Sequence, residues 1–166
     1  MILASLLLML ADNPTCRPCK VSPAGIGLIQ HFEGYSPFVY EDVAGKKTIG
    51  FGHLILPGER FREPMLPDEA TKLLEKDAAR TVSGVNRMVR VPLRQGQADS
   101  LHSFAFNLGT GALQSSTLLK RVNSGRHADV PGEFLLWNKA RVGGVLRVFP
   151  GLTRRREAES EFYQLD

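Results

Sequence analysis

The sequence predicts a mostly helical α+β protein, built as one domain or as two small lobes that share a helix. Apolar residues recur at helical spacing over much of residues 67–165, and two short strand patterns flank a turn within residues 38–51. The helical pattern at 67–88 is long enough to connect two lobes. With 166 residues, 43% of them hydrophobic, the chain can bury a core without disulfide bonds or metal ions.

The first twenty residues form a segment of their own. Residues 2–11 are an apolar run of ten, about half the roughly 20 residues that a membrane-spanning helix needs. No Lys or Arg precedes the run and no small-x-small cleavage site follows it, so a cleaved signal is poorly supported. It is either an arm that packs on the domain or a shortened membrane anchor. We divide the chain into an apolar arm and linker, 1–20, and one domain, 21–166.

The chain contains two cysteines, Cys16 and Cys19, in the sequence Cys-Arg-Pro-Cys. Two are too few for a disulfide framework, and a zinc site would need a second pair or histidines at ligand spacing. We interpret them as tail cysteines that can pair with each other in an oxidising compartment.

A short helix is expected from Pro23 to Gly34. Ser22 is suited to be its N-cap, Pro23 to be its first residue, and Gly34 to end it. Glu33 falls one turn after Ile29, on the same stripe as the apolar residues. A carboxyl group is unusual on such a stripe.

A β-hairpin is expected next, with strands at 38–40 and 47–51 around a turn at 43–46. Asp42 lies at the rim of the turn. Alternation along the second strand points Thr48 the same way as two glycines, which would let a ligand approach the backbone closely.

The rest of the chain is predicted to be helical, with loops at 57–67 and at the glycine pair 143–144. The expected helices run from Pro67 to about Met88, from Gln97 to Leu108, from a cap at Ser115 or Ser116 to near Gly125, for one to three turns within Pro131–Ala140, and from a cap at Thr153 to the C-terminus.

Cations crowd the predicted start of the last helix. Arg154, Arg155 and Arg156 would lie in its first turn, where the helix dipole disfavours each cation by about 0.3–1 kcal/mol. We expect a negative charge to offset this cost. Either one arginine pairs with Glu33, or one contacts an anionic wall polymer. The alternative is a solvated basic patch, because surface ion pairs are weak.

Glu33, Asp42 and Thr48 form a candidate catalytic group. A carboxyl group among apolar residues loses solvation of its charged form, and one that keeps its proton near neutral pH can act as a general acid. Asp42, at an exposed turn near two lysines, would stay charged, and Thr48 could orient a water molecule. Glycoside hydrolysis needs two carboxyl groups in these roles. The alternative is that all three are ordinary structural residues.

The spacing of these residues, E-x8-D-x5-T-I-G-F-G-H-L, resembles the Glu/Asp/Thr catalytic motif of phage-type lysozymes. These are the glycoside hydrolase family 24 muramidases, which include the T-even phage lysozyme. The resemblance continues through residues 103–109, 116–119 and 151–157 and Trp137. It covers about residues 22–163 and does not include the first twenty.

The resemblance implies a lysozyme-like fold, in which a small β-hairpin lobe is joined by a long helix to a helical lobe and peptidoglycan binds in the cleft between them. It implies hydrolysis of the β-1,4 bond between N-acetylmuramic acid and N-acetylglucosamine, without metal or cofactor. Glu33 would be the general acid, Asp42 the base or electrostatic stabiliser, and Thr48 the residue that positions water. The substrate-binding residues implied are Leu54, Phe106 and Thr117.

His53 is expected to be structural. It would lie on the face of the second strand that carries Ile49, pointing away from Thr48. Buried polar groups of this kind are normally held by hydrogen bonds.

The resemblance also implies an endolysin that acts as a monomer on peptidoglycan and causes lysis of the host cell. It would be made in the cytoplasm of the host bacterium and act in the periplasm on the cell wall. Membrane contact is expected only through residues 2–11, and nucleic acid is not an expected partner. The formal charge of +4 and the pI near 9.3 favour attraction to polyanions such as the wall.

Two other functions remain open. A non-catalytic basic module that binds the wall or nucleic acid would explain the charge but not the motif, and the chain lacks zinc-finger spacing and the aromatic-basic pattern of an RNA-binding sheet. A transglycosylase would use the same acid but form an anhydro product.

Overall fold

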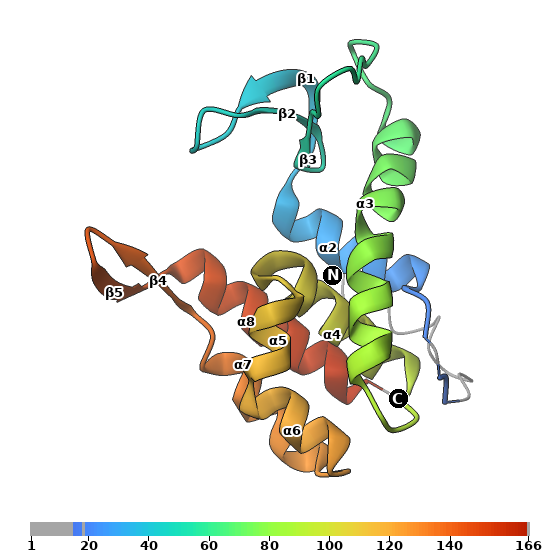
Figure 1. Cartoon of the computed structure of the whole chain (residues 1–166), viewed down its shortest axis with the longest axis vertical. Helices are drawn as coiled ribbons and strands as arrows, with labels where there is room; N and C mark the ends of the chain where they lie inside the picture. Colours follow the sequence, from blue (N-terminus) through green and yellow to red (C-terminus); the bar gives the residue numbers. More distant parts are fainter. Residues whose placement is uncertain (1–14, 18, 166) are drawn as a thin grey trace.

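Two lobes joined by α3 (Pro67–Met88) make up the protein in the computed structural model, which describes residues 15–17 and 19–165. Figure 1 shows a small β-sheet at one end of α3 and a bundle of helices at the other. The predicted α+β class and two-lobed arrangement are therefore confirmed. The predicted apolar arm, 2–11, lies outside the described residues.

Most of the predicted elements are present. The helices are α2 (Pro23–Glu33), α3 (Pro67–Met88), α4 (Gln95–Leu108), α5 (Thr110–Ser115), α6 (Thr117–Asn123), α7 (Val130–Leu135) and α8 (Pro150–Gln164), with a short 3-10 helix at His127–Asp129. The strands are β1 (Ser36–Glu41), β2 (Lys47–Gly50), β3 (His53–Leu54), β4 (Lys139–Val142) and β5 (Val145–Val148).

The cap of α2 agrees with the prediction. The Ser22 hydroxyl accepts a hydrogen bond from the Gly25 backbone N–H, Pro23 begins the helix, and Gly34 ends it with a positive φ of 73°. Asp99 of α4 anchors this cap, because its carboxylate accepts hydrogen bonds from the Ser22 backbone N–H at 2.9 Å and from the hydroxyl at 2.5 Å.

The small lobe contains an antiparallel sheet of order β1-β2-β3. The prediction of one strand through Phe51 is wrong, because Gly50 and Gly52 adopt positive φ and turn the chain into β3. The expected bare face at Gly50 is also wrong: a Cβ there would lie 3.3 Å from Ala70 Cβ and Met65 Sδ, so α3 covers this side. The absence of a side chain at Gly50 therefore lets α3 pack closely on the strand, and it does not open the strand to a ligand.

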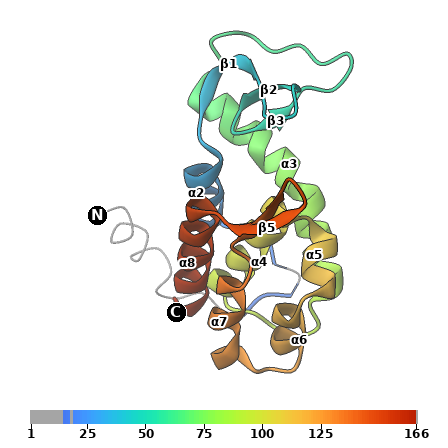
Figure 2. The same cartoon turned by 90° about the vertical axis from the view of Figure 1, so that its left-hand side faces the viewer.

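The helical lobe is built around α4. Figure 2 shows α4 behind β5, between α8 and α5. Leu101 and Phe104 of this helix are fully buried in the main hydrophobic core. The predicted pairing of Cys16 with Cys19 is confirmed, and Cys19 is itself a buried member of this core. Cys16 also exchanges two backbone hydrogen bonds with Leu93, which ties the predicted linker to the lobe.

Two predictions for the C-terminal region are wrong. The helical turns expected within Pro131–Ala140 are present as α7 and end at Leu135, but the region expected to be a loop around the glycine pair 143–144 is instead the turn of a second hairpin, residues 139–148. Gly143 and Gly144, flanked by Val142 and Val145, both have positive φ, as a tight hairpin turn requires. The last helix begins at Pro150 rather than at Thr153, so Arg154 is its fifth residue and the cations avoid the first turn.

His53 fastens the sheet to α3. Its Nδ1 lies 2.7 Å from Asp77 Oδ2 of α3, and its Nε2 lies 3.0 Å from Glu59 Oε2 of the following loop. Burial by itself lowers the pKa of His53, but hydrogen bonds to Glu59 and Asp77 and their negative charges outweigh it, so the pKa lies above 6.5. The predicted structural role is confirmed.

Because His53 is bound to Asp77 and Glu59, we expect the stability of the protein to depend on pH. Because folding raises the pKa, charged His53 stabilises the native state fully below pH 6.5, and this contribution is lost as the pH rises through the raised value. We expect His53→Gln to lower the free energy of unfolding by about 1–3 kcal/mol at pH 5.5, and by less at pH 9, in urea denaturation. Asp77→Asn, which removes one charge, should weaken the pH dependence. An equal loss at both pH values would contradict the prediction.

Candidate active site

Glu33 is held by Arg155 at the junction of α2 and α8. Glu33 is the last residue of α2, and its Oε1 accepts a hydrogen bond of 2.7 Å from Arg155 Nη1. The ion pair is partly buried, with 23% of the Glu33 side chain and 4% of the Arg155 side chain exposed. The compensating contact predicted for one of the three arginines is therefore present. A Cβ at Gly52 would lie 3.7 Å from Glu33 Oε2, so the other oxygen faces the turn of the small lobe.

An open pocket of about 460 Å³ surrounds this pair. It is formed by the end of α2, the end of α4, the start of α8 and the residue that precedes α8. Its lining residues are His31, Phe32, Glu33, Asn107, Phe149, Gly151, Leu152, Arg154 and Arg155. The pocket therefore combines apolar side chains with polar groups and charges of both signs, as a site for a hydroxyl-rich ligand with charged substituents would.

A buried network fixes Arg155. Glu159, one turn later on α8, is fully buried, and its Oε1 accepts hydrogen bonds from Ser103 Oγ at 2.7 Å, Arg156 Nη2 at 2.9 Å and Arg155 Nε at 3.3 Å. Burial raises the pKa of Glu159, while the charges of Arg156 and Arg155 act in the opposite direction. Because Arg155 is bound on both sides, the Glu33 carboxyl has one preferred orientation.

Asp42 lies in the turn between β1 and β2, as predicted, and is half-buried. Its Oδ1 accepts hydrogen bonds from the backbone N–H groups of Ala44 at 2.8 Å and Lys46 at 2.9 Å. One oxygen thus shapes the turn, and within the described residues Oδ2 makes no hydrogen bond. The turn therefore uses one oxygen of Asp42 and leaves the other available to a ligand or water.

Thr48 is buried in the central strand of the sheet, where its hydroxyl donates to the Lys46 carbonyl at 3.1 Å. Its pairing partners on the two sides are Tyr40 and Leu54. Residues paired directly across antiparallel strands share a face, so Leu54, predicted to bind substrate, lies beside Thr48. Leu54 and Tyr40 are each 40% exposed.

The other two predicted substrate-binding residues lie elsewhere. Phe106 packs against the buried cluster that contains Ile26 and Leu74, next to Asn107 of the pocket. Thr117 is exposed at the first residue of α6 and does not line the pocket around Glu33. Of the six predicted site residues, the pocket lining thus includes Glu33 alone.

The sequence interpretation missed several residues that shape the site. Glu159 gave no signal, because it recurs among exposed glutamates of the same helix. Tyr40 and Phe149 looked like ordinary strand and loop aromatics. Asn107 lies within the 103–109 segment on which the family resemblance rests, and this was the available signal.

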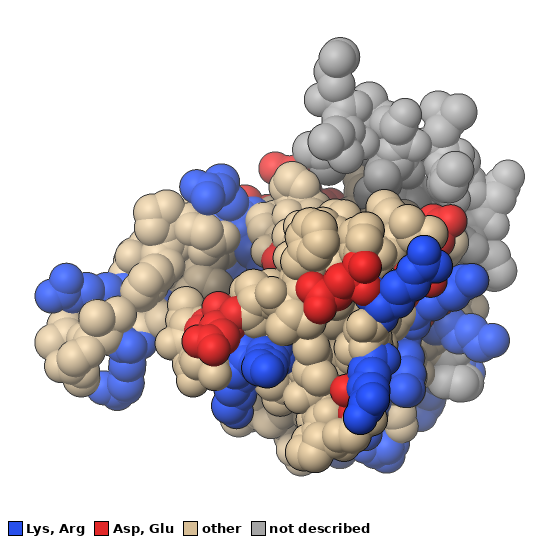
Figure 3. Space-filling view, turned by 90° about the horizontal axis from the view of Figure 1, so that it is seen from above, with Lys and Arg blue, Asp and Glu red and all other residues tan. Residues whose placement is uncertain are grey.

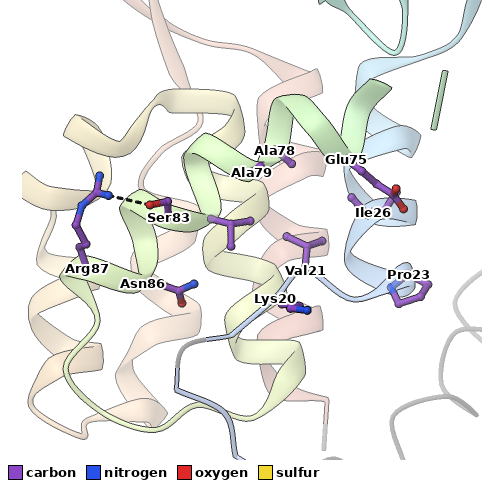
Figure 4. A pocket seen from close by; sticks show the side chains of 11 residues that line it. Lys20, Val21, Pro23, Ile26, Glu75, Ala78, Ala79, Ser83, Asn86 and Arg87 are labelled. Carbon is purple, nitrogen blue, oxygen red and sulfur yellow. Dashed lines mark hydrogen bonds between the residues drawn. The ribbon is translucent and has the colours of Figure 1, made fainter. Parts of the chain in front are cut away.

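A larger pocket of about 720 Å³ lies between α3 and the chain before α2 (Figure 4). Its floor is apolar, formed by residues such as Ala78, Val82 and Ile26, and Arg87 at one end donates to Ser83 Oγ at 2.8 Å. None of the predicted catalytic residues lines it. Among residues 15–17 and 19–165, no group of three His, Cys, Asp or Glu side chains is arranged to hold a metal ion.

Known proteins with similar sequences cover most of this chain. The Phage lysozyme family profile matches residues 30–159. An endolysin of Bacillus phage B103 is 42% identical over 149 residues, covering 87% of this chain and 54% of the relative, so this chain spans about half of that protein. An endolysin of Acyrthosiphon pisum secondary endosymbiont phage 1 is 35% identical, covering 87% of this chain and 97% of the relative. A SAR-endolysin of Escherichia phage Mu is 33% identical over 81% of this chain and 75% of its own length.

Solved structures show the same fold. An endolysin from Escherichia coli O157:H7 phage FAHEc1 superposes with a TM-score of 0.81 at 34% identity, covering 88% of this chain and 94% of its own. A mutant of P22 lysozyme superposes with a TM-score of 0.76 at 30% identity, covering 87% and 98% of the two chains. The predicted lysozyme-like fold is confirmed.

The network behind Arg155 predicts a strong effect of one substitution. Glu159→Gln removes the carboxylate that pairs with buried Arg156 and one of the two that pair with Arg155, so we expect the free energy of unfolding to fall by about 3–5 kcal/mol. Urea denaturation at pH 7 measures this. The control is Glu157→Gln, an exposed residue of the same helix, for which a change within about 0.5 kcal/mol is expected. Equal stability of the two variants would contradict the role assigned to Glu159.

Proposed function

The chain belongs to the phage lysozyme family, so it is a glycoside hydrolase of the muramidase type, and we propose that it is an endolysin that hydrolyses the β-1,4 bond between N-acetylmuramic acid and N-acetylglucosamine. The observation that supports this most is the placement of Glu33. The carboxyl group of this motif residue is held in one orientation by Arg155 and opens onto a pocket, and a general acid needs such positioning close to its substrate.

Glu33 protonates the glycosidic oxygen in this proposal. Oε1 is occupied by Arg155, so the proton is delivered from Oε2, on the side of Gly52. Protonation of the leaving oxygen is the task of one carboxyl group in glycoside hydrolysis, and the second either activates water or supports the oxocarbenium-like transition state.

Asp42 supplies the second carboxyl group. Its Oδ1 is held by the turn, and Oδ2 remains for water or for the developing positive charge. Thr48 orients the water by its hydroxyl, beside Leu54 on the same face of the sheet. The reaction uses side chains and water and needs no metal or cofactor.

The remaining substrate contacts are proposed at Leu54, Phe106 and Thr117, the positions that match the family pattern. Leu54 is supported by its exposure beside Thr48. Tyr40, paired with Thr48 on the other side, is an additional candidate, because an exposed aromatic ring offers a flat apolar surface to a sugar.

As a phage endolysin the protein acts on the host cell wall. We propose that it is made in the host cytoplasm, reaches the periplasm, and works there as a monomer. None of the helices within the described part of the chain combines the length and hydropathy needed to cross a bilayer. Membrane contact through residues 2–11 and the division into arm and linker, 1–20, and catalytic domain, 21–166, are likewise proposals. The proposed membrane contact is supported by the fact that some relatives are named SAR-endolysins.

Removal of the acid tests the proposal. Glu33→Gln keeps an oxygen for the hydrogen bond from Arg155 but cannot donate a proton, so we expect lysis of peptidoglycan to fall about 10²–10⁴-fold with the fold retained. Glu161→Gln, an exposed residue of α8, is the control. Undiminished lysis would overturn the glycosidase assignment, and salt-sensitive DNA binding would then favour the basic module. In mass spectra of the products, added water indicates hydrolysis and anhydro sugars indicate a transglycosylase.

One substitution separates the structural role of Asp42 in the turn from its proposed catalytic role. In Asp42→Asn the amide oxygen can still accept the turn hydrogen bonds of Ala44 and Lys46, so stability should hold while turnover falls about 10²-fold or more. Glu41→Gln, at the exposed last residue of β1, removes a charge from the adjacent position as a control. Equal turnover by the two variants would assign Asp42 to the turn alone.

A further inference from the structure

The hairpin β4–β5 is the most exposed element of the protein. Every residue of β5 is exposed, and in β4 only Ala140 is half-buried. Val142, Val145, Leu146 and Val148 are each between 48% and 56% exposed. An isolated two-stranded hairpin is at best marginally stable in water. The exposed valine and leucine side chains on both of its faces therefore indicate a surface that binding to a partner would stabilise.

All charged residues of the hairpin are cationic. Lys139, Arg141 and Arg147 lie on its strands, and no Asp or Glu occurs between Trp137 and Glu157. In Figure 3 the part that projects farthest to the left carries blue and tan atoms and no red ones. The register pairs Ala140 with Arg147 and Arg141 with Leu146. Because paired residues share a face and successive pairs alternate, cations and apolar side chains occur on both faces.

The position of the hairpin connects it with the site of Glu33. Phe149, the residue after β5, is 37% exposed and lines the same pocket as Glu33. The root is pinned by a hydrogen bond of 2.9 Å from the Phe149 N–H to the Asn138 carbonyl, and Asn138 also contacts Thr153 of α8. Figures 1 and 2 place β4–β5 on the side of the molecule to which the β1–β2 hairpin also projects.

We propose that β4–β5 is a docking surface for the peptide stems of peptidoglycan, flanking the site that takes the glycan. Stem peptides carry free carboxylates, which match Lys139, Arg141 and Arg147, and alanine methyl groups, which match the exposed valines. The surface is continuous with the pocket through Phe149. The inference rests on the proposed function, since it assumes that a glycan occupies the pocket beside Glu33.

The test compares two ligands in a Glu33→Gln background, so that nothing is hydrolysed. The ligands are soluble glycan fragments that bear stem peptides and the same fragments after an amidase has removed them. The readout is the ratio of the two dissociation constants. In the variant Lys139→Gln/Arg141→Gln/Arg147→Gln, the preference for stem-bearing fragments, measured by this ratio, should be roughly tenfold smaller than in the parent. This is the size expected for three exposed charge pairs.

A control variant removes three charges elsewhere. Lys72→Gln/Arg90→Gln/Lys120→Gln changes exposed residues of α3, of the loop after it and of α6, and the ratio should stay as in the parent. Arg147→Glu alone should lower the preference further than Arg147→Gln. Circular dichroism establishes that each variant is folded.

The outcomes separate the two proposals. An unchanged ratio in the hairpin variant overturns the docking surface, and if that variant instead loses binding to phosphatidylglycerol vesicles, the hairpin is a membrane contact. An equal fall in the control variant overturns it as well, because the effect is then one of total charge. Failure of the proposed function shows separately, as hydrolysis that survives Glu33→Gln, and does not enter the binding ratio.

Discussion

The ion pair between Arg155 and Glu33 is the interaction on which the geometry of the site depends. A buried guanidinium is costly unless its N–H groups are satisfied, and Arg155 is satisfied by Glu33 on one side and by Glu159 on the other. Ser103 adds α4 to the same network. Three helices from distant parts of the chain are thus held in one arrangement, and the Glu33 carboxyl is oriented as a result.

The second carboxyl group is positioned in a different way. Asp42 is fixed by hydrogen bonds to residues two and four positions later, so its placement within the turn is local. Its position relative to Glu33 depends on how the sheet is attached to α3. His53 and Gly50 make that attachment, His53 through Asp77 and Gly50 through close packing on Ala70. The site therefore joins a carboxyl set by tertiary contacts to one set by a turn.

The two hairpins have different relations to the core. In the small lobe, Ile49 is fully buried against Met65 and Ala70, so the sheet is part of a packed unit. The residues of β4–β5 are almost all exposed, and the core of the helical lobe is complete without them. An element outside the buried core is free to serve recognition, and its root at Phe149 places it beside the pocket.

The sequence by itself determined the features that depend on neighbours along the chain: the cap and end of α2, the first hairpin turn, the length of α3, and the spacing of Glu33, Asp42 and Thr48. It could name three arginines as candidates to pair with Glu33, but periodicity does not identify distant partners. Only the tertiary structure selected Arg155, buried Glu159 behind it, covered Gly50 with α3, and left residues 139–148 as an exposed hairpin. The choice of Arg155 and the burial of Glu159 follow from contacts 122 and 56 positions apart along the chain, where burial and charge pairing, rather than local propensity, decide the conformation. The pairing within the hairpin is local, but its exposure depends on how the rest of the chain packs.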